Sequence, residues 1–275
     1  MEQSKLDSTK KSVTDVFDNI AKSQSWESLY LGKPNRLTYN FISRHNEIES
    51  LFNEINIVSS NVLDLGCGTG ELIRYFYGKV KTYKGIDIST EMIIRAQKIH
   101  EKLVIPGKYE FESADSENLD SKNTFQVVTA IALIEYFSDP TRMLNEISRL
   151  TEKAGYALVT VPNKSCVNFK IRDMFAPIRN ALYPIYLKLK KAEISDMRNV
   201  THYHYTKDEL DGLMLKNKLE LVSFRFSNFY FIPHPLDHLF ANLYIRLSEI
   251  AATSKNPSKY YFFAANYIAL YRKIK

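Results

Sequence analysis

The sequence contains few cysteines and no long hydrophobic run. Among its 275 residues, Cys67 and Cys166 are the only cysteines, which argues against a disulfide framework and favours a reducing compartment. No apolar stretch reaches the roughly 20 residues that a transmembrane helix requires, and the N-terminus lacks the pattern of a signal peptide. We therefore expect a cytoplasmic protein rather than a secreted or membrane-spanning one.

Most of the chain also carries no excess of positive charge. The formal net charge is +6, but residues 164–191 hold seven Lys and Arg residues against one acid, Asp173. This segment carries the whole excess, and the remainder is close to neutral. A basic surface is therefore expected in this segment alone, while a hydrophobic content of 45% is typical of a globular chain.

The order of helix and strand signals predicts three parts. Residues 1–12 are polar and are expected to be a disordered tail, and 13–58 follow a helical spacing expected to form an N-terminal cap. From residue 59 to 275, strand and helix signals alternate, which predicts one α/β domain with a lid insertion at 164–200 and a helical insertion at 233–258.

Five short apolar segments predict parallel strands, at 62–65, 80–88, 109–113, 125–131 and 156–161. The later segments 219–232 and 261–271 are aromatic and β-branched, and suit an antiparallel edge. Asp139-Pro140 and the capping box Thr206 to Glu209 each predict a helix start. The expected fold class is a Rossmann-like, doubly wound α/β sheet, parallel with an antiparallel edge strand, carrying N-terminal helices and a helical lid insertion.

The segment NVLDLGCGTG (61–70) places Gly66, Gly68 and Gly70 directly after a strand. Glycine lacks a Cβ and tolerates positive φ, so such a turn lets a ligand approach the main chain. A dinucleotide fingerprint requires glycine at position 71, which is Glu71, and a P-loop lysine is absent. The turn therefore predicts a ligand site, with pyrophosphate an unfavourable ligand.

Acidic residues follow three neighbouring strands. Asp87 ends the second strand, where a carboxylate can accept hydrogen bonds from both ribose hydroxyls. Asp115 follows the third strand, where it can accept a hydrogen bond from an adenine amino group, and Asp64 can face a charged amino group. Three acids without a phosphate-binding cation favour a cationic nucleoside.

With these residues the sequence resembles the class I S-adenosylmethionine-dependent methyltransferases. The matching segments are VLDLGCGTG (62–70), GIDIS (85–89), ADSENL (114–119), FQVVTAIALIEYFSDP (125–140) and YALVTVPN (156–163). The resemblance implies S-adenosyl-L-methionine as the cofactor. It further implies that the three glycines line the methionine part and that Asp87 holds the ribose.

The same resemblance implies roles for other residues. Ile88 would pack on the adenine, Asp115 and Ser116 would read its edge, and Ile131 would close the pocket. In the segment WESLY (26–30), Tyr30 would reach the cofactor carboxylate. Other interpretations stay open: the glycines as a structural turn, Asp115 as a helix cap, and Tyr30 as a core contact.

Candidate catalytic residues lie in THYHYTKDEL (201–210) and after the fourth strand. His202 and His204 alternate in an extended segment and are expected to point the same way, and histidine can act as a base near neutral pH. Glu135 occupies a position that the family commonly uses on the substrate side. His234 and His238 are further candidates. Surface histidines without a role are the alternative.

The layout is most similar to methyltransferases acting on quinones, sugars and secondary metabolites. The ubiquinone-pathway enzymes carry a further acid and a histidine where this chain has Ala132 and Tyr136. With no other cluster at metal-ligand spacing, a metal-independent reaction is expected.

The basic segment 164–191 allows three interpretations: a solvated lid over a small-molecule pocket, a peripheral contact with an anionic membrane, or, less favoured, a nucleic-acid contact. The leading functional hypothesis is O- or N-directed methyl transfer, by in-line displacement, to a small, largely apolar or lipid-linked acceptor. The alternatives are an RNA methyltransferase and a non-catalytic module that binds the cofactor or docks on a membrane.

Overall fold

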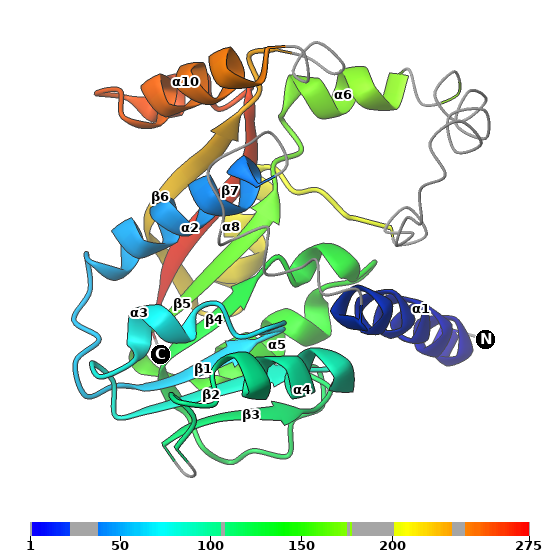
Figure 1. Ribbon diagram of the computed structural model, residues 1–275, viewed down its shortest axis with the longest axis vertical. Coiled ribbons are helices and arrows are strands. Elements are labelled where there is room, and N and C mark those ends of the chain that lie inside the picture. The colour runs from blue at the N-terminus through cyan, green and yellow to red at the C-terminus, as the bar shows by residue number, and fades with distance from the viewer. Residues whose placement is uncertain are drawn as a thin grey trace.

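The computed structural model describes residues 2–22, 38–105, 108–174, 177, 201–232 and 240–274, with the side chains of residues 2–9 left aside. Its centre is a seven-stranded sheet of order β3-β2-β1-β4-β5-β7-β6 (Figure 1). The strands are β1 (Asn61–Leu65), β2 (Thr82–Asp87), β3 (Tyr109–Ser113), β4 (Phe125–Ile131), β5 (Thr151–Pro162), β6 (Leu219–Phe229) and β7 (Ala264–Lys273).

The strand order reverses between β1 and β4. Strand β1 pairs in parallel with β2 on one side and with β4 on the other, so Leu65 lies between Ile86 and Ala130. In open α/β sheets this is the point where ligands bind, beyond the carboxyl ends of the strands. Strand β7 is antiparallel to both β5 and β6. The predicted fold class is confirmed, although β7 lies one place in from the edge and β6 forms the edge itself.

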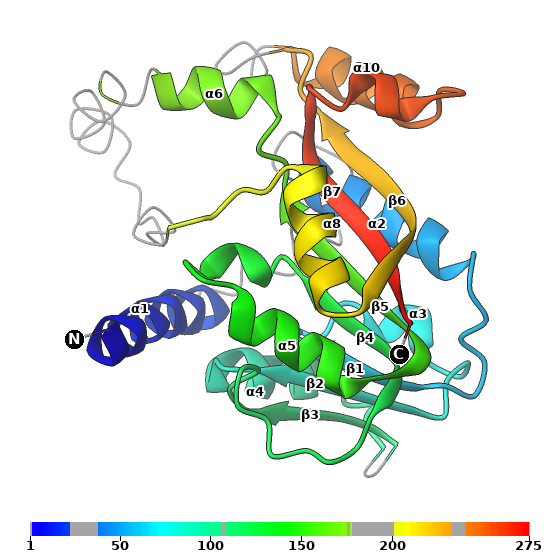
Figure 2. The same cartoon turned by 180° about the vertical axis from the view of Figure 1, so that it is seen from behind.

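Helices cover both faces of the sheet. The α-helices are α1 (Glu2–Lys22), α2 (Tyr39–Phe52), α3 (Ile73–Phe76), α4 (Thr90–Ile99), α5 (Thr141–Leu150), α6 (Val167–Met174), α8 (Lys207–Lys216) and α10 (Ala241–Ala252). Helices α2, α3 and α4 pack on the face seen in Figure 1. Helices α5 and α8 pack on the opposite face (Figure 2). Each face buries its own apolar core, which fixes the sheet and the loops at its carboxyl edge.

Side-chain caps fix the starts of two helices. The Ser89 side chain accepts a hydrogen bond from the Met92 amide and caps α4. Thr206 and Glu209 form the capping box that opens α8. Helix α3, after the glycine turn, is only four residues long.

The N-terminal helix corrects one expectation. Residues 1–12 were expected to be disordered because they are polar, but α1 begins at Glu2. Tertiary contacts override composition here: Lys10 Nζ lies 2.7 Å from Asp115 Oδ2 and 2.6 Å from Glu117 Oε2. The expected boundary between a tail and a cap at residue 13 therefore falls inside one helix, while the other domain boundaries stay predictions.

Candidate functional site

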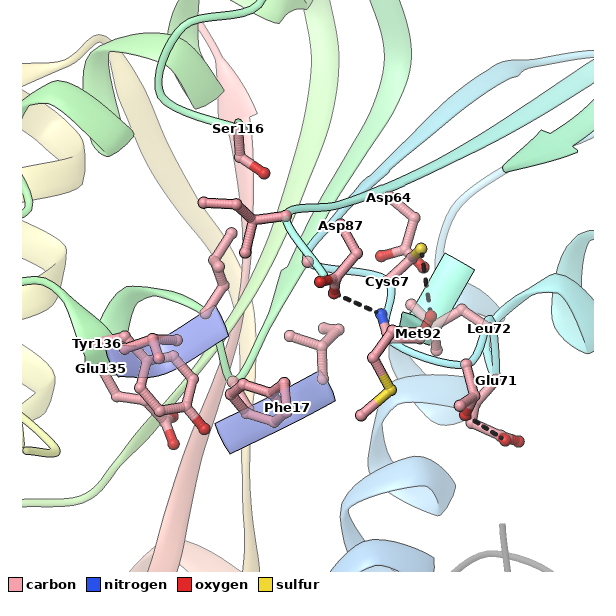
Figure 3. A pocket seen from close by; sticks show the side chains of 18 of the residues that line it. Phe17, Asp64, Cys67, Glu71, Leu72, Asp87, Met92, Ser116, Glu135 and Tyr136 are labelled. Atoms are coloured by element: carbon pink, nitrogen blue, oxygen red, sulfur yellow. Dashed lines mark hydrogen bonds between the residues drawn. The ribbon is translucent and has the colours of Figure 1, made fainter. Parts of the chain in front are cut away.

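A cavity of about 320 Å³ lies beyond the carboxyl ends of β1, β2 and β4 (Figure 3). Most of the residues predicted to hold the cofactor line it: Asp64, Gly66, Gly68, Asp87, Ile88, Asp115, Ser116 and Ile131. The fold therefore brings together residues that are up to 67 positions apart in the sequence. Their individual roles remain predictions.

The three glycines of the turn divide into two kinds. Gly66 and Gly68 have φ of +68° and +53° and line the cavity. A Cβ added to Gly68 would have nothing within 4 Å, so the main chain there is open to a ligand. Gly70 has φ of +78°, and its Cβ would lie 2.5 Å from the Phe111 ring. Gly70 lies outside the cavity lining and is required by packing.

Asp87 is held at the end of β2 by the main chain. Its two carboxylate oxygens accept hydrogen bonds from the Gly68 and Ser89 amides, each at 2.9 Å. Burial raises the pKa of this carboxyl, and the two backbone hydrogen bonds oppose that change. Each oxygen keeps a second acceptor position, which matches the predicted recognition of ribose hydroxyls.

Asp64 is buried beneath the turn. Its oxygens accept hydrogen bonds from the Tyr83 hydroxyl at 2.7 Å and the Thr129 hydroxyl at 2.6 Å. Burial raises the pKa of Asp64 to about 6, against the effect of these donors, and the nearby Asp87 adds to the rise. Two acids beside one cavity favour a positively charged ligand, because a cation relieves the cost of burying them.

Cys67 also lines this cavity. Burial, together with the nearby Asp64 and Asp87, raises the pKa of its thiol well above the usual value. A buried neutral thiol is a poor nucleophile. Cys67 is therefore a packing residue of the turn.

Helix α1 supplies residues that the sequence analysis missed. Val13 and Phe17 line the cavity, and the Phe17 ring packs edge-on against Tyr136 at 5.5 Å (Figure 3). Lys10 pairs with Asp115, whose other oxygen accepts the Glu117 amide at 3.0 Å. Asp115 thus stabilises a turn instead of capping a helix, and it also faces the cavity. Its contact with the adenine stays a prediction. The helical spacing of Val13 and Phe17 was the available signal.

A second cavity, of about 640 Å³, adjoins the first. Its lining includes Phe169, Tyr203 and Tyr230. His204 belongs to this cavity alone, with its ring 4.9 Å from that of Phe169. Burial lowers the pKa of His204, and the positive charge of Arg172 contributes to the decrease.

Four residues line both cavities: Asn40, Arg44, Glu135 and His202. His202 Nδ1 lies 3.2 Å from Glu135 Oε1. The main chain fixes this pair, because the Tyr203 amide donates to the Glu135 carbonyl at 2.7 Å. Two of the three predicted catalytic residues are therefore in contact at the junction. Asn40 and Arg44, on α2, carried no motif.

Some predicted residues lie outside the described part of the chain. These are Tyr30, His234, His238 and most of the lid insertion 164–200. Across the ranges that the structure does describe, no group of three or more His, Cys, Asp or Glu has a geometry that could hold a metal ion. Among the helices in those ranges, none is long and apolar enough to cross a membrane.

The first cavity has the features that S-adenosylmethionine requires. Open main chain at Gly68 leaves room for a ligand, and Asp87 offers fixed acceptor oxygens. The buried carboxyls of Asp64 and Asp87 suit the positive charges of a sulfonium and an ammonium group. The described residues of the lining therefore fit this cofactor.

Comparisons with known proteins agree with this arrangement. The family model described as "Methyltransferase domain" matches residues 34–223. A ubiquinone biosynthesis O-methyltransferase of Colwellia psychrerythraea is 28% identical over 167 residues, covering 58% of this chain and 67% of that protein. A phosphatidylethanolamine N-methyltransferase of Cereibacter sphaeroides is 30% identical over 106 residues, or 38% of this chain and 52% of that protein. The chain thus spans between half and two thirds of the length of these relatives.

A solved structure extends the likeness to nearly the whole fold. The magnesium protoporphyrin IX methyltransferase of Synechocystis, crystallised with S-adenosylhomocysteine, superimposes with a TM-score of 0.65 at 15% identity. The alignment covers 96% of this chain and 99% of that one. The family match covers more than half of the sequence, and the motifs, the fold and the cavity are consistent with it. The chain therefore belongs to the methyltransferase-domain family, and its predicted class, the class I S-adenosylmethionine-dependent methyltransferases, is confirmed.

Proposed function

We propose that this methyltransferase methylates a hydroxyl or amine of a small acceptor held in the second cavity, with His202 as the general base. The observation that carries the proposal is the Glu135–His202 pair, which lines both cavities. A base at this junction can reach an acceptor in one cavity while the acceptor faces the cofactor in the other. Geometry of this kind is the first requirement for general base catalysis.

The pair assigns a role to each ring nitrogen of His202. With the proton on Nδ1, the ring donates to Glu135 and leaves Nε2 as an acceptor for the proton of the methyl acceptor. Glu135 then stabilises the imidazolium that forms, and it holds the ring in this tautomer. S-adenosylmethionine, when bound, supplies an electrophilic methyl group that an in-line displacement transfers without a metal ion.

The first cavity positions the cofactor and excludes water. We assign the ribose to Asp87, the methionine portion to Gly66 and Gly68, and the adenine to the region of Ile88. Phe17 and Leu133 form apolar walls of the same cavity. Removing water from this site strengthens the electrostatic interactions inside it and supports the reaction.

The acceptor is proposed to be a small molecule with an apolar or lipid-linked portion. The relatives named above, for ubiquinone and phosphatidylethanolamine, support this class. Tyr230, directly after β6, lines the second cavity and supports an apolar portion of the acceptor, whereas Phe226 and Phe229 of β6 are buried in the core. Contact of residues 164–191 with an anionic membrane remains part of the proposal.

Transfer of a labelled methyl group tests this function. The protein is incubated with methyl-labelled S-adenosylmethionine and, separately, with a set of phenols and amines, a lipid extract and bulk RNA. We expect label in a small-molecule or lipid fraction, and retention on vesicles containing anionic lipid at low salt. Label in RNA alone would contradict the acceptor class, and absence from the vesicles would remove the membrane contact.

A further inference from the structure

Arg44 is a buried arginine that has no counter-ion among the residues described by the structure. It lies on α2 with 8% of its surface exposed, and its buried Nε atom has no hydrogen-bond partner within the same described ranges. Its guanidinium carbon lies 5.5 Å from the Phe41 ring centroid, a cation–π contact that offsets only part of the desolvation. A buried guanidinium is normally paired with a carboxylate or phosphate, because burying a lone charge is costly. A bound anion would therefore stabilise Arg44.

The neighbouring carboxylates of the cavities are already engaged. Glu135 contacts His202, and Glu71 pairs with Arg74. Within the described ranges, Arg44 forms no ion pair. The cations of the second cavity differ in this respect, because Lys164 pairs with Glu209 and Arg172 with Asp173. Among the residues that the structure describes, Arg44 is thus the cation without a partner, and an incoming anion could pair with it.

Asn40 adds a second donor one helical turn before Arg44. Its Oδ1 accepts hydrogen bonds from the amide nitrogens of Asn228 and Asn266, both at 2.8 Å. These two donors fix the orientation of the Asn40 amide, so its own NH₂ group is directed away from them. Residues four apart on a helix share one face. Arg44 and Asn40 therefore present donors, and no acceptor, from the same side of α2.

The position of this donor set indicates which ligand it serves. Asn40 and Arg44 line both cavities, as Glu135 and His202 do. The residues assigned to the cofactor, such as Gly68 and Asp87, line the first cavity alone. The donor set therefore lies with the proposed general base, at the junction of the two cavities.

We propose that Arg44 and Asn40 bind an oxyanion, a carboxylate or phosphate, that the methyl acceptor carries. This inference rests on the proposed function, and it adds a charged group to an acceptor described above only as small and partly apolar. The planar fork of a guanidinium matches the oxygens of a carboxylate or phosphate. Held there, the anionic group would orient the acceptor with its hydroxyl or amine toward His202.

Calorimetry with three matched probes tests the proposal. Protein saturated with S-adenosylhomocysteine is titrated with benzoate, phenyl phosphate and benzamide, which share one ring and differ in charge. We expect at least one anion to bind ten times more tightly than benzamide; which of the two binds identifies the oxyanion. Arg44→Gln should remove this preference, and Arg44→Lys, which keeps the charge without the fork, should retain part of it.

A control variant and a stability measurement exclude a merely structural role. Arg74→Gln changes an arginine that already pairs with Glu71 and lies outside both cavity linings, so it should leave the preference unchanged. Arg44→Gln should unfold in urea at the same or a higher concentration than the original protein, because it removes an uncompensated buried charge.

Three results would overturn the proposal. The first is equal binding of all three probes by the original protein. The second is a preference for anions that persists in Arg44→Gln. The third is a tenfold loss of S-adenosylhomocysteine affinity in Arg44→Gln, which would assign Arg44 to the cofactor carboxylate. Failure of the proposed function would give a different result. In that case His202→Gln would leave methyl transfer intact, and the preference of the original protein for anions would be unaffected.

Discussion

The two cavities of this methyltransferase are built in different ways. The cofactor cavity takes its predicted acids and glycines from the carboxyl ends of β1, β2 and β3 and from the turns that follow them. Asp64 and Asp87 lie within β1 and β2, whereas Gly66, Gly68 and Asp115 follow within three residues of a strand end. The second cavity, where we propose that the acceptor binds, combines α2, the turn after β4, the segment 201–204 and the ends of β5 and β7. The first is encoded by short motifs, whereas the second exists only once distant segments have folded together.

This difference separates two tasks. A cofactor common to a family can be held by main chain and a few acids that any such sheet places at the same edge. An acceptor is selected by side chains that loops and added helices bring to the junction. Changes in one cavity should therefore affect one property of the enzyme and leave the other unchanged.

The largest expected effect comes from the junction. His202→Gln should lower the rate of methyl transfer by roughly 10² to 10⁴-fold, the usual contribution of a general base, because Nε2 would no longer accept the acceptor's proton. Affinity for S-adenosylmethionine, measured by calorimetry, should stay within about twofold. His204→Gln, in the second cavity alone, should lose less. A large loss of cofactor affinity in His202→Gln would show that the two cavities are not independent.

Substitutions in the glycine turn sharpen the distinction between packing and binding. Gly70→Ala should lower the free energy of unfolding by about 2–4 kcal/mol, because it adds left-handed strain and a clash with Phe111. Gly68→Ala meets no neighbour, so it should cost only about 1–2 kcal/mol and should chiefly weaken cofactor binding. Urea unfolding and calorimetry measure the two effects. Equal destabilisation by both would contradict the separation of roles.

The ribose assignment predicts a loss confined to the cofactor cavity. Asp87→Ala should weaken S-adenosylmethionine binding at least tenfold, or about 1.4 kcal/mol, since it removes the acceptor oxygens fixed by Gly68 and Ser89. Asp120→Ala, an exposed acid away from both cavities, is the matched control. Undiminished binding by Asp87→Ala would remove the assignment.

The raised pKa of Asp64 predicts how cofactor affinity depends on pH. Burial raises this pKa to about 6, so the carboxyl is mostly ionised at pH 7 and mostly protonated at pH 5. Only the ionised form attracts the cofactor's ammonium group, so affinity should fall roughly tenfold as pH decreases from 7 to 5. Asp64→Asn should bind weakly with little dependence on pH. A wild-type affinity that is constant over this range would contradict the role of Asp64.

The difference between the two cavities also explains which features could be predicted from the sequence. The strands, the fold class and the acids after the strands depend on local patterns, and the structure places them at one edge. Residues of α1 and α2, such as Phe17 and Arg44, reach the cavities only through tertiary packing. Helical spacing marks Phe17 as a residue of an apolar helix face, but it does not show that this face lines a cavity. Gly70 shows a second limit of prediction from sequence. Its position in the motif does not reveal that it packs against Phe111.

A crystal structure of the complex with S-adenosylhomocysteine tests the central claim most directly. We predict that the ribose contacts Asp87 and that the sulfur atom faces the junction where His202 and Glu135 meet. A sulfur atom directed away from the second cavity, or a cofactor bound elsewhere in the molecule, would contradict this account of the two cavities.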